Sequence, residues 1–181
     1  MKRLVLPLAL ALCAAPLAAQ QAASPVAPPA GASVAATRAL WQMMAAYVQR
    51  SAEQMPEADF SYRPVDGVRT FGQVVAHVAG SQYMFCAAAT GDAARGEDDV
   101  ERTHTSKADI VQAFRESTAY CERAYAQNDA AAAQPITLFG QPRTRFYALT
   151  MNAVHVSEHY GNLVTYLRMK GMVPPSSQPR Q

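Results

Sequence analysis

The sequence has little charge and no concentrated block of either sign. Charged residues make up 17% of its 181 residues, and the formal net charge is only +2 at pH 7. Proteins that bind nucleic acids usually present a basic patch, so we expect no nucleic-acid partner. After the first twelve residues, no apolar run approaches the ~20 residues that a membrane-spanning helix needs. We therefore expect no stable membrane anchor in the mature protein.

The one strongly apolar segment lies at the start of the chain. Lys2 and Arg3 precede an apolar run over residues 4–12, and small residues follow at Ala18 and Ala19. This order is typical of a secretory signal peptide, and the apolar run is too short to span a membrane. We assign residues 1–19 as a signal peptide and predict that the protein is exported, either to the periplasm or to the outside of the cell.

Cysteine is also scarce, with three residues in all. Cleavage would remove Cys13 and leave Cys86 and Cys121, an even number in an oxidising compartment, which permits a disulfide. The alternative is two small buried thiols. The sequence does not decide between them, because a disulfide depends on the separation of the two Cα atoms in the fold.

Helical patterns dominate the remaining chain, and no convincing strand alternation is present. Residues 20–32 are rich in Pro, Ala and Ser and are typical of an unpacked tether. The folded domain is predicted to cover 33–177. Apolar spacing and end signals predict helices over 33–55, 70–89, 106–125 and 142–170. Thr70 and Gln73 form a capping box. Four helices without a sheet predict an all-α, four-helix bundle.

The last predicted helix carries two histidines, His155 and His159. Four residues are slightly more than one helical turn, so both rings project from the same face. They belong to an uncharged polar stripe beside the apolar face, which suggests the lining of a cavity. Its members are Asn152, His155, His159, Asn162 and Tyr166.

A third histidine, His77, lies on the second helix next to its apolar face, with Gln73, Ser81 and Met84 at helical spacing. Three neutral imidazoles hold a divalent transition metal and leave one position open for water or substrate. The alternative for any single histidine is a hydrogen-bonded structural role, which we favour for His104 in the acidic loop.

The same stretch also contains an H-x-x-E-H motif, in which Glu158 stands beside the two histidines. In inverzincins this motif carries two zinc ligands and a general base. A further acidic ligand is then needed downstream, and the 22 residues after His159 contain none. We therefore do not favour an inverzincin. Glu158, Tyr83 and Tyr166 stay candidates for the acid or base, and the sequence does not identify it.

Two stretches of the chain resemble the DinB-like helical superfamily, which includes relatives of bacillithiol transferases and mycothiol-dependent enzymes. They are "YRPVDGVRTFGQVVAHVAGSQYMF" and "HVSEHYGNLVTYLRMKGMVPPSS", and the resemblance extends over 33–177. It implies a four-helix bundle in which His77, His155 and His159 bind a metal such as zinc or nickel. Family members commonly carry H-x-G-Q where this chain has "HYGN". Asn162 thus replaces a longer amide, which implies an altered contact with a ligand or substrate.

These observations lead to one expected function and one alternative. The first is an exported DinB-like protein with a three-histidine divalent metal site, acting as a metal-dependent hydrolase or thiol transferase. The alternative is a non-catalytic bundle that binds a metal or a small ligand. We expect a small-molecule substrate or ligand, and we leave open whether the protein forms a homodimer.

Overall fold

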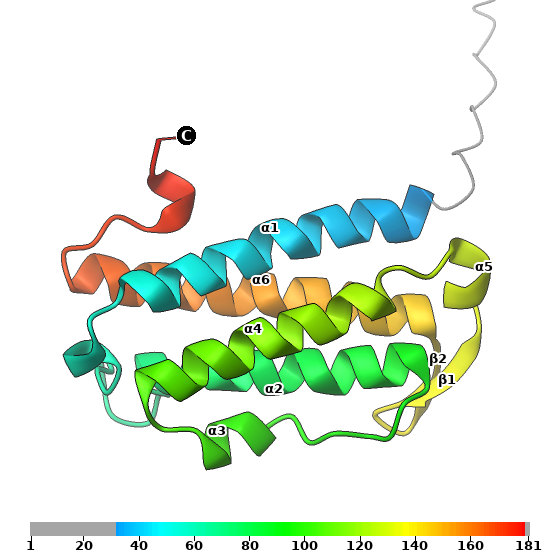
Figure 1. Ribbon diagram of the computed structural model, residues 1–181, viewed down its shortest axis with the longest axis horizontal. Coiled ribbons are helices and arrows are strands. Elements are labelled where there is room, and N and C mark those ends of the chain that lie inside the picture. Colours follow the sequence, from blue (N-terminus) through cyan, green and yellow to red (C-terminus); the bar gives the residue numbers. More distant parts are fainter. Residues whose placement is uncertain (1–31, 180–181) are drawn as a thin grey trace, which may run out of the picture.

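A computed structural model of the protein describes residues 32–179 (Figure 1). The predicted signal peptide and nearly all of the predicted tether lie outside the described residues. Within the described part of the chain, no helix combines the length and the apolar character needed to cross a membrane.

Four long helices form the body of the molecule: α1 (Ala32–Gln54), α2 (Phe71–Thr90), α4 (Lys107–Ala124) and α6 (Arg145–Met169). Helix α2 packs along both α4 and α6, and α1 packs along the same two helices (Figure 1). The first two helices of the chain therefore lie diagonally across the bundle and scarcely touch each other. The prediction of an all-α, four-helix bundle is confirmed.

The helix ends follow the local signals in the sequence. Thr70 accepts a hydrogen bond from the Gln73 backbone, and the Gln73 side chain accepts one from the Thr70 backbone, so the predicted capping box is present. Gly91 ends α2 with a left-handed φ of 83°, which glycine adopts without the steric cost that a Cβ would add. Ser106 caps α4 by accepting from the Asp109 backbone.

One part of the prediction was wrong: the chain before α6 contains two short strands. β1 (Pro135–Leu138) and β2 (Gln141–Thr144) pair antiparallel, with Leu138 opposite Gln141. Phe139 and Gly140 form the turn, both with positive φ, at 51° and 70°. The strands are too short to show alternation, and a Phe-Gly turn lacks the usual Asn-Gly signature. Because Pro142 lies in β2, the last helix begins at Arg145 instead of at Pro142.

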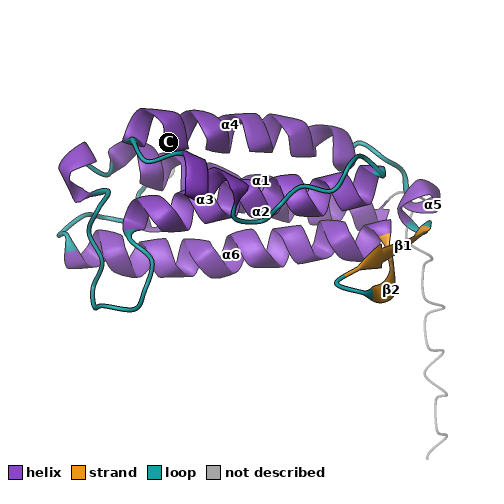
Figure 2. Ribbon diagram, turned by 90° about the horizontal axis from the view of Figure 1, so that it is seen from below, coloured by secondary structure: helices purple, strands orange, loops and turns teal. Residues whose placement is uncertain are grey.

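Four shorter elements complete the fold: η1 (Glu57–Asp59), α3 (Asp99–Thr103), α5 (Asp129–Ala132) and η2 (Pro175–Ser177). Helix α3 lies in the acidic segment that we predicted to be a loop. It packs on α2, and Figure 2 shows the preceding loop running along the same side of the bundle. This segment brings acidic side chains close to α2.

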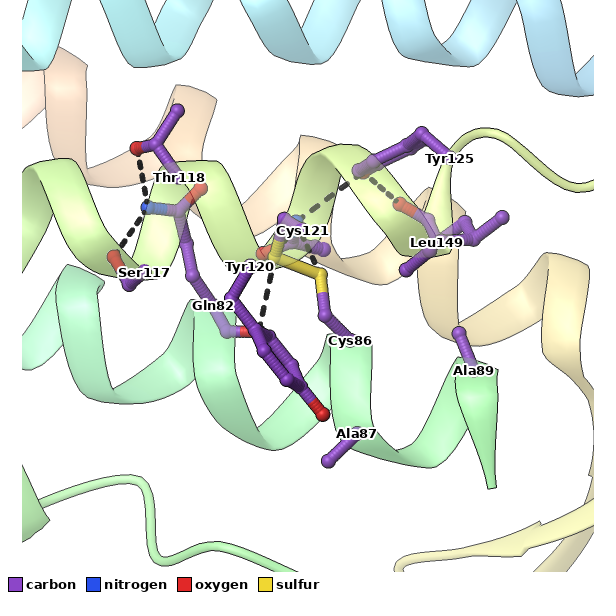
Figure 3. The surroundings of a disulfide bond; sticks show 12 residues. Gln82, Cys86, Ala87, Ala89, Ser117, Thr118, Tyr120, Cys121, Tyr125 and Leu149 are labelled. Atoms are coloured by element: carbon purple, nitrogen blue, oxygen red, sulfur yellow. Dashed lines mark hydrogen bonds between the residues drawn. A yellow bond between two sulfur atoms is a disulfide. The ribbon is translucent and has the colours of Figure 1, made fainter. Parts of the chain in front are cut away.

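The two cysteines of the domain are joined by a disulfide that ties α2 to α4 (Figure 3). The Cα atoms of Cys86 and Cys121 are 5.3 Å apart, and both residues are fully buried. Asn152 of α6 points its amide nitrogen at both sulfurs, at 3.6 and 3.7 Å, and at the Tyr125 hydroxyl. The sequence left open whether Cys86 and Cys121 form a disulfide or remain two buried thiols, and the structure shows the disulfide.

Candidate metal centre

The three predicted histidines come together between α2 and α6. One ligand nitrogen from each lies within 4.8 Å of the others. The Nε2 atoms of His155 and His159 are 3.1 Å apart. The ring of His77 is centred 5.2 Å from that of His155 and 4.9 Å from that of His159. The packing of α2 against α6 thus brings His77 next to the pair of histidines that helical spacing places on one face of α6.

His77 is buried and has its second ring nitrogen turned toward acidic side chains. Its Nδ1 lies 3.3 Å from Asp98 Oδ1 and 3.9 Å from Glu101 Oε2. Arg69 pairs with both carboxylates, through Nε to Glu101 at 3.0 Å and through Nη2 to Asp98 at 3.6 Å. These carboxylates favour the tautomer with the proton on Nδ1. That tautomer leaves the Nε2 lone pair facing the cluster, as in the carboxylate–histidine pairs of many metal sites.

The two histidines of α6 have different outer neighbours. Asn162 places its amide nitrogen 3.2 Å from His159 Nδ1, so the residue that departs from the family motif contacts a predicted ligand. His155 Nδ1 is buried and has no hydrogen-bond partner among the described residues. An unpaired buried polar atom costs free energy, and such groups in a native protein often serve a function.

Both histidines of α6 are held in the neutral form. Burial lowers the pKa of His159 to about 3, and the neighbouring His155 and His77 contribute in the same direction. Burial also lowers the pKa of His155, and the nearby His77 lowers it further. At neutral pH these imidazoles therefore have lone pairs free to bind a cation, without first losing a proton.

A carboxylate that the sequence analysis missed also faces the cluster. Glu97 Oε1 lies 3.7 Å from His77 Nε2 and 3.5 Å from His155 Nε2, and it accepts a hydrogen bond of 2.9 Å from the Ser81 hydroxyl. The sequence contained one signal for this contact, a glycine in the middle of α2. A Cβ on Gly80 would lie 1.9 Å from the Glu97 carbonyl oxygen, so only glycine lets the loop approach this closely.

A pocket of about 360 Å³ adjoins the His159 side of the cluster. Tyr166 donates a hydrogen bond to the Arg69 carbonyl at 2.6 Å and so fixes the loop before α2 against α6. The pocket is lined by Pro64, Gly67, Val68, Arg69, Val74, His159, Asn162 and Tyr166. It combines apolar walls with a guanidinium and an amide, which suits a small molecule with a polar end.

Other candidates from the sequence lie elsewhere. The proposed polar stripe does not line one cavity, because Asn152 faces the disulfide. Tyr83 is partly buried and packs against the guanidinium of Arg95, whose Cζ lies 3.6 Å from the centre of the tyrosine ring. Glu158 is exposed to solvent. His104 bonds the Thr103 hydroxyl at 2.9 Å and takes no part in the three-histidine cluster.

The fold and the histidine cluster together define a helical bundle with a potential metal centre in its interior. Residues 36–163 match the sequence profile of the DinB superfamily. This match covers more than half of the chain, so the protein belongs to the DinB superfamily. No curated protein matches the sequence.

Solved structures share the fold at low sequence identity. A DinB-like protein from Bacillus cereus is 20% identical with a TM-score of 0.66, over 77% of this chain and 93% of its own. YfiT from Bacillus subtilis, described as a "probable metal-dependent hydrolase with an unusual four-helix bundle topology", is 16% identical with a TM-score of 0.61, over 83% and 94%. The mycothiol-dependent maleylpyruvate isomerase is 16% identical with a TM-score of 0.61, over 72% of this chain and 60% of its own.

Proposed function

We propose that this protein is an exported, metal-dependent enzyme, either a hydrolase or a thiol transferase, that acts on a small molecule. In this proposal His77, His155 and His159 hold one divalent transition metal. The observation that carries it is the convergence of three imidazoles beside a pocket. One solved structure of this fold is described as a probable metal-dependent hydrolase, which supports hydrolysis. Another is described as a mycothiol-dependent isomerase, so its reaction depends on a thiol.

The side chains present fit such a metal. Neutral imidazole nitrogens suit zinc and nickel alike. The acidic partners of His77 Nδ1 orient one ring, and the low pKa of His159 keeps a second ring available. When bound, a divalent metal with three neutral ligands lowers the pKa of a coordinated water or thiol toward neutrality.

The surrounding residues would bind and orient the substrate. Val68 and Val74 offer apolar surface in the pocket. Arg69 also lines it, as part of an ion pair with Asp98 and Glu101. The Asn162 amide contacts His159, a proposed metal ligand, and also lines the pocket where the substrate would bind. Export separates a protein from the low-molecular-weight thiols of the cytosol, which favours hydrolysis over thiol transfer.

Metal analysis of the purified protein tests the site. After dialysis against metal-free buffer, the wild type should retain about one divalent metal ion per chain. His77→Ala, His155→Ala and His159→Ala should each lose it, because two imidazoles hold a metal far more weakly than three. His104→Ala is the matched control and should retain the metal. Full retention by all three variants would refute the site.

Turnover separates the enzyme from a binding protein. The metal-loaded and metal-stripped proteins should be assayed against generic ester and thiol-transfer substrates, and we expect activity only with metal. Stoichiometric metal without turnover would instead support the alternative of a non-catalytic binding bundle.

Export has a separate test. The N-terminal sequence of protein isolated from its native host should begin between residues 18 and 24, because signal peptides are cleaved after small residues. An intact Met1 in a cytosolic fraction would contradict export without affecting the metal site.

A further inference from the structure

We propose that Glu97 is a fourth protein ligand of the metal, so that the resting site has three histidines and one carboxylate. This inference rests on the proposed metal site and specifies its first coordination shell. The fourth coordination position of the metal would then be occupied by a side chain of the loop before α3, and would not be open to water or substrate in the resting protein.

The distances between donor atoms carry the inference. Two ligands of a tetrahedral zinc ion, each ~2.0–2.1 Å from the metal, lie about 3.3–3.4 Å apart. Glu97 Oε1 is 3.5 Å from His155 Nε2 and 3.7 Å from His77 Nε2. The Nε2 atoms of His155 and His159 are 3.1 Å apart. The carboxylate oxygen thus has the spacing of a ligand from two imidazoles.

Charge distribution points the same way. Asp98 and Glu101, which also approach His77, are both paired with Arg69. Glu97 has no such partner among the described residues, since its ion-pair contacts are only with His77 and His155. The Glu97 side chain is 35% exposed, so water and the Ser81 hydroxyl solvate part of its charge, and a cation at the centre of the cluster would compensate the rest.

The backbone around Glu97 holds the side chain in this position. Ser81, one turn beyond His77 on α2, donates its hydroxyl to Glu97 Oε1 at 2.9 Å and is itself fully buried. The Glu97 carbonyl packs against Gly80, where any side chain would collide with it. The carboxylate therefore approaches the histidines through two contacts with the same helix that carries His77.

A consequence for substrate binding follows. A donor atom from the substrate must take the place of the Glu97 carboxylate or enter beside it from the His159 side, where the pocket lies. The residues of the loop before α3 would then influence which substrates gain access.

Zinc and cobalt binding test this proposal on the mature chain. Zinc affinity, measured by competition with a chromophoric chelator, should fall at least ~10-fold in Glu97→Gln. The visible spectrum of the cobalt(II)-loaded protein should also change, because it reports the donor set. Ser81→Ala should give a smaller loss in the same direction. Glu116→Gln, the same substitution at an exposed position of α4, is the control and should match the wild type.

Glu97→Asp distinguishes ligation from a general charge effect, because it keeps the charge and shortens the reach. Ligation predicts weaker binding and an altered cobalt spectrum in this variant too. Circular dichroism should show that each variant is folded. If Glu97→Gln does not fold, zinc affinity and the cobalt spectrum of Ser81→Ala test the proposal in its place.

Wild-type affinity and spectrum in Glu97→Gln would overturn the inference while leaving the three-histidine site intact. Full affinity in Glu97→Asp with an unchanged spectrum would overturn it as well, in favour of charge alone. Failure of the wild type to bind either metal would instead overturn the proposed function.

Discussion

Helix α2 carries two polar clusters within six residues, and they differ in how completely their hydrogen bonds are satisfied. Around Gln82, the pairing is complete. Its Oε1 accepts from Trp41 Nε1 at 2.8 Å, and its amide donates to Ser117 and Thr118 at 2.9 and 3.2 Å. Both hydroxyls in turn donate to the Phe114 carbonyl at 2.9 Å. Every donor in this buried cluster has an acceptor.

Around His77 the balance is different. Three imidazoles and the Glu97 carboxylate present more lone pairs than protons, and His155 Nδ1 lacks a partner in the described chain. A fully paired buried network stabilises a fold, whereas an acceptor-rich and incompletely paired one is suited to bind a cation. Both clusters are polar, and the balance of donors against acceptors is what differs between them.

The largest effect on stability is expected from the disulfide that joins α2 to α4. Replacing both Cys86 and Cys121 with Ala should lower the free energy of unfolding by about 4 kcal/mol, because the bridge closes a long loop and so restricts the unfolded chain. Denaturant unfolding of oxidised wild type and of the double variant measures the difference. Equal midpoints would show that the bridge contributes nothing to stability.

A smaller effect is expected from the Gln82 cluster. Gln82→Ala leaves the buried Trp41 N–H without an acceptor, which should cost about 1–3 kcal/mol of unfolding free energy. Zinc affinity should stay at the wild-type value, since this cluster does not contact the histidines. Thermal unfolding together with zinc titration measures both quantities. A variant that lost zinc affinity while keeping its stability would reverse the proposed roles of the two clusters.

The smallest effect concerns pH and the metal-free protein. The pKa of His159 is about 3 in the folded state against 6.5 for an unperturbed histidine. Between these values the unfolded chain binds more protons, so stability should fall as pH drops from about 6.5 toward 3. The ring is only partly buried, and solvent screening reduces the size of the effect.

The His159→Gln variant should show a shallower pH dependence than the wild type. Chelator-treated samples unfolded at pH 7, 5.5 and 4 provide the measurement. Identical slopes for the two proteins would mean that His159 titrates normally in the folded state.

Local sequence signals predicted those parts of the site that depend on one helix at a time. The His155–His159 pair follows from helical spacing, and Thr70 with Gln73 marked where the helix carrying His77 begins. The prediction that Asn152 lines the same cavity as the histidines was wrong, because the surroundings of this polar stripe change along the length of α6. One turn toward the start of α6 from His155, the neighbouring helices present the disulfide in place of histidine and carboxylate.

Glu97 could not be placed because its position depends on how a loop packs. Its sequence surroundings are an acidic stretch typical of a solvated loop, and the contact with α2 exists only because Gly80 lacks a side chain. Nothing in the spacing of acidic residues reveals which helix a loop crosses. The Phe139–Gly140 turn was missed for a related reason, since its positive φ values depart from the usual preference of phenylalanine.

The disulfide also encloses the loop that bears Glu97. Cys86 and Cys121 close a covalent ring over the end of α2, the loop, α3 and most of α4, and Glu97 lies inside that ring. In the oxidised chain both ends of the Glu97 loop stay tied to α2, the helix that carries His77, so closing the loop against that helix costs less conformational entropy than in the reduced chain. Reduction should therefore weaken the contact between the Glu97 loop and α2, which connects the redox state of the surroundings to the proposed fourth ligand.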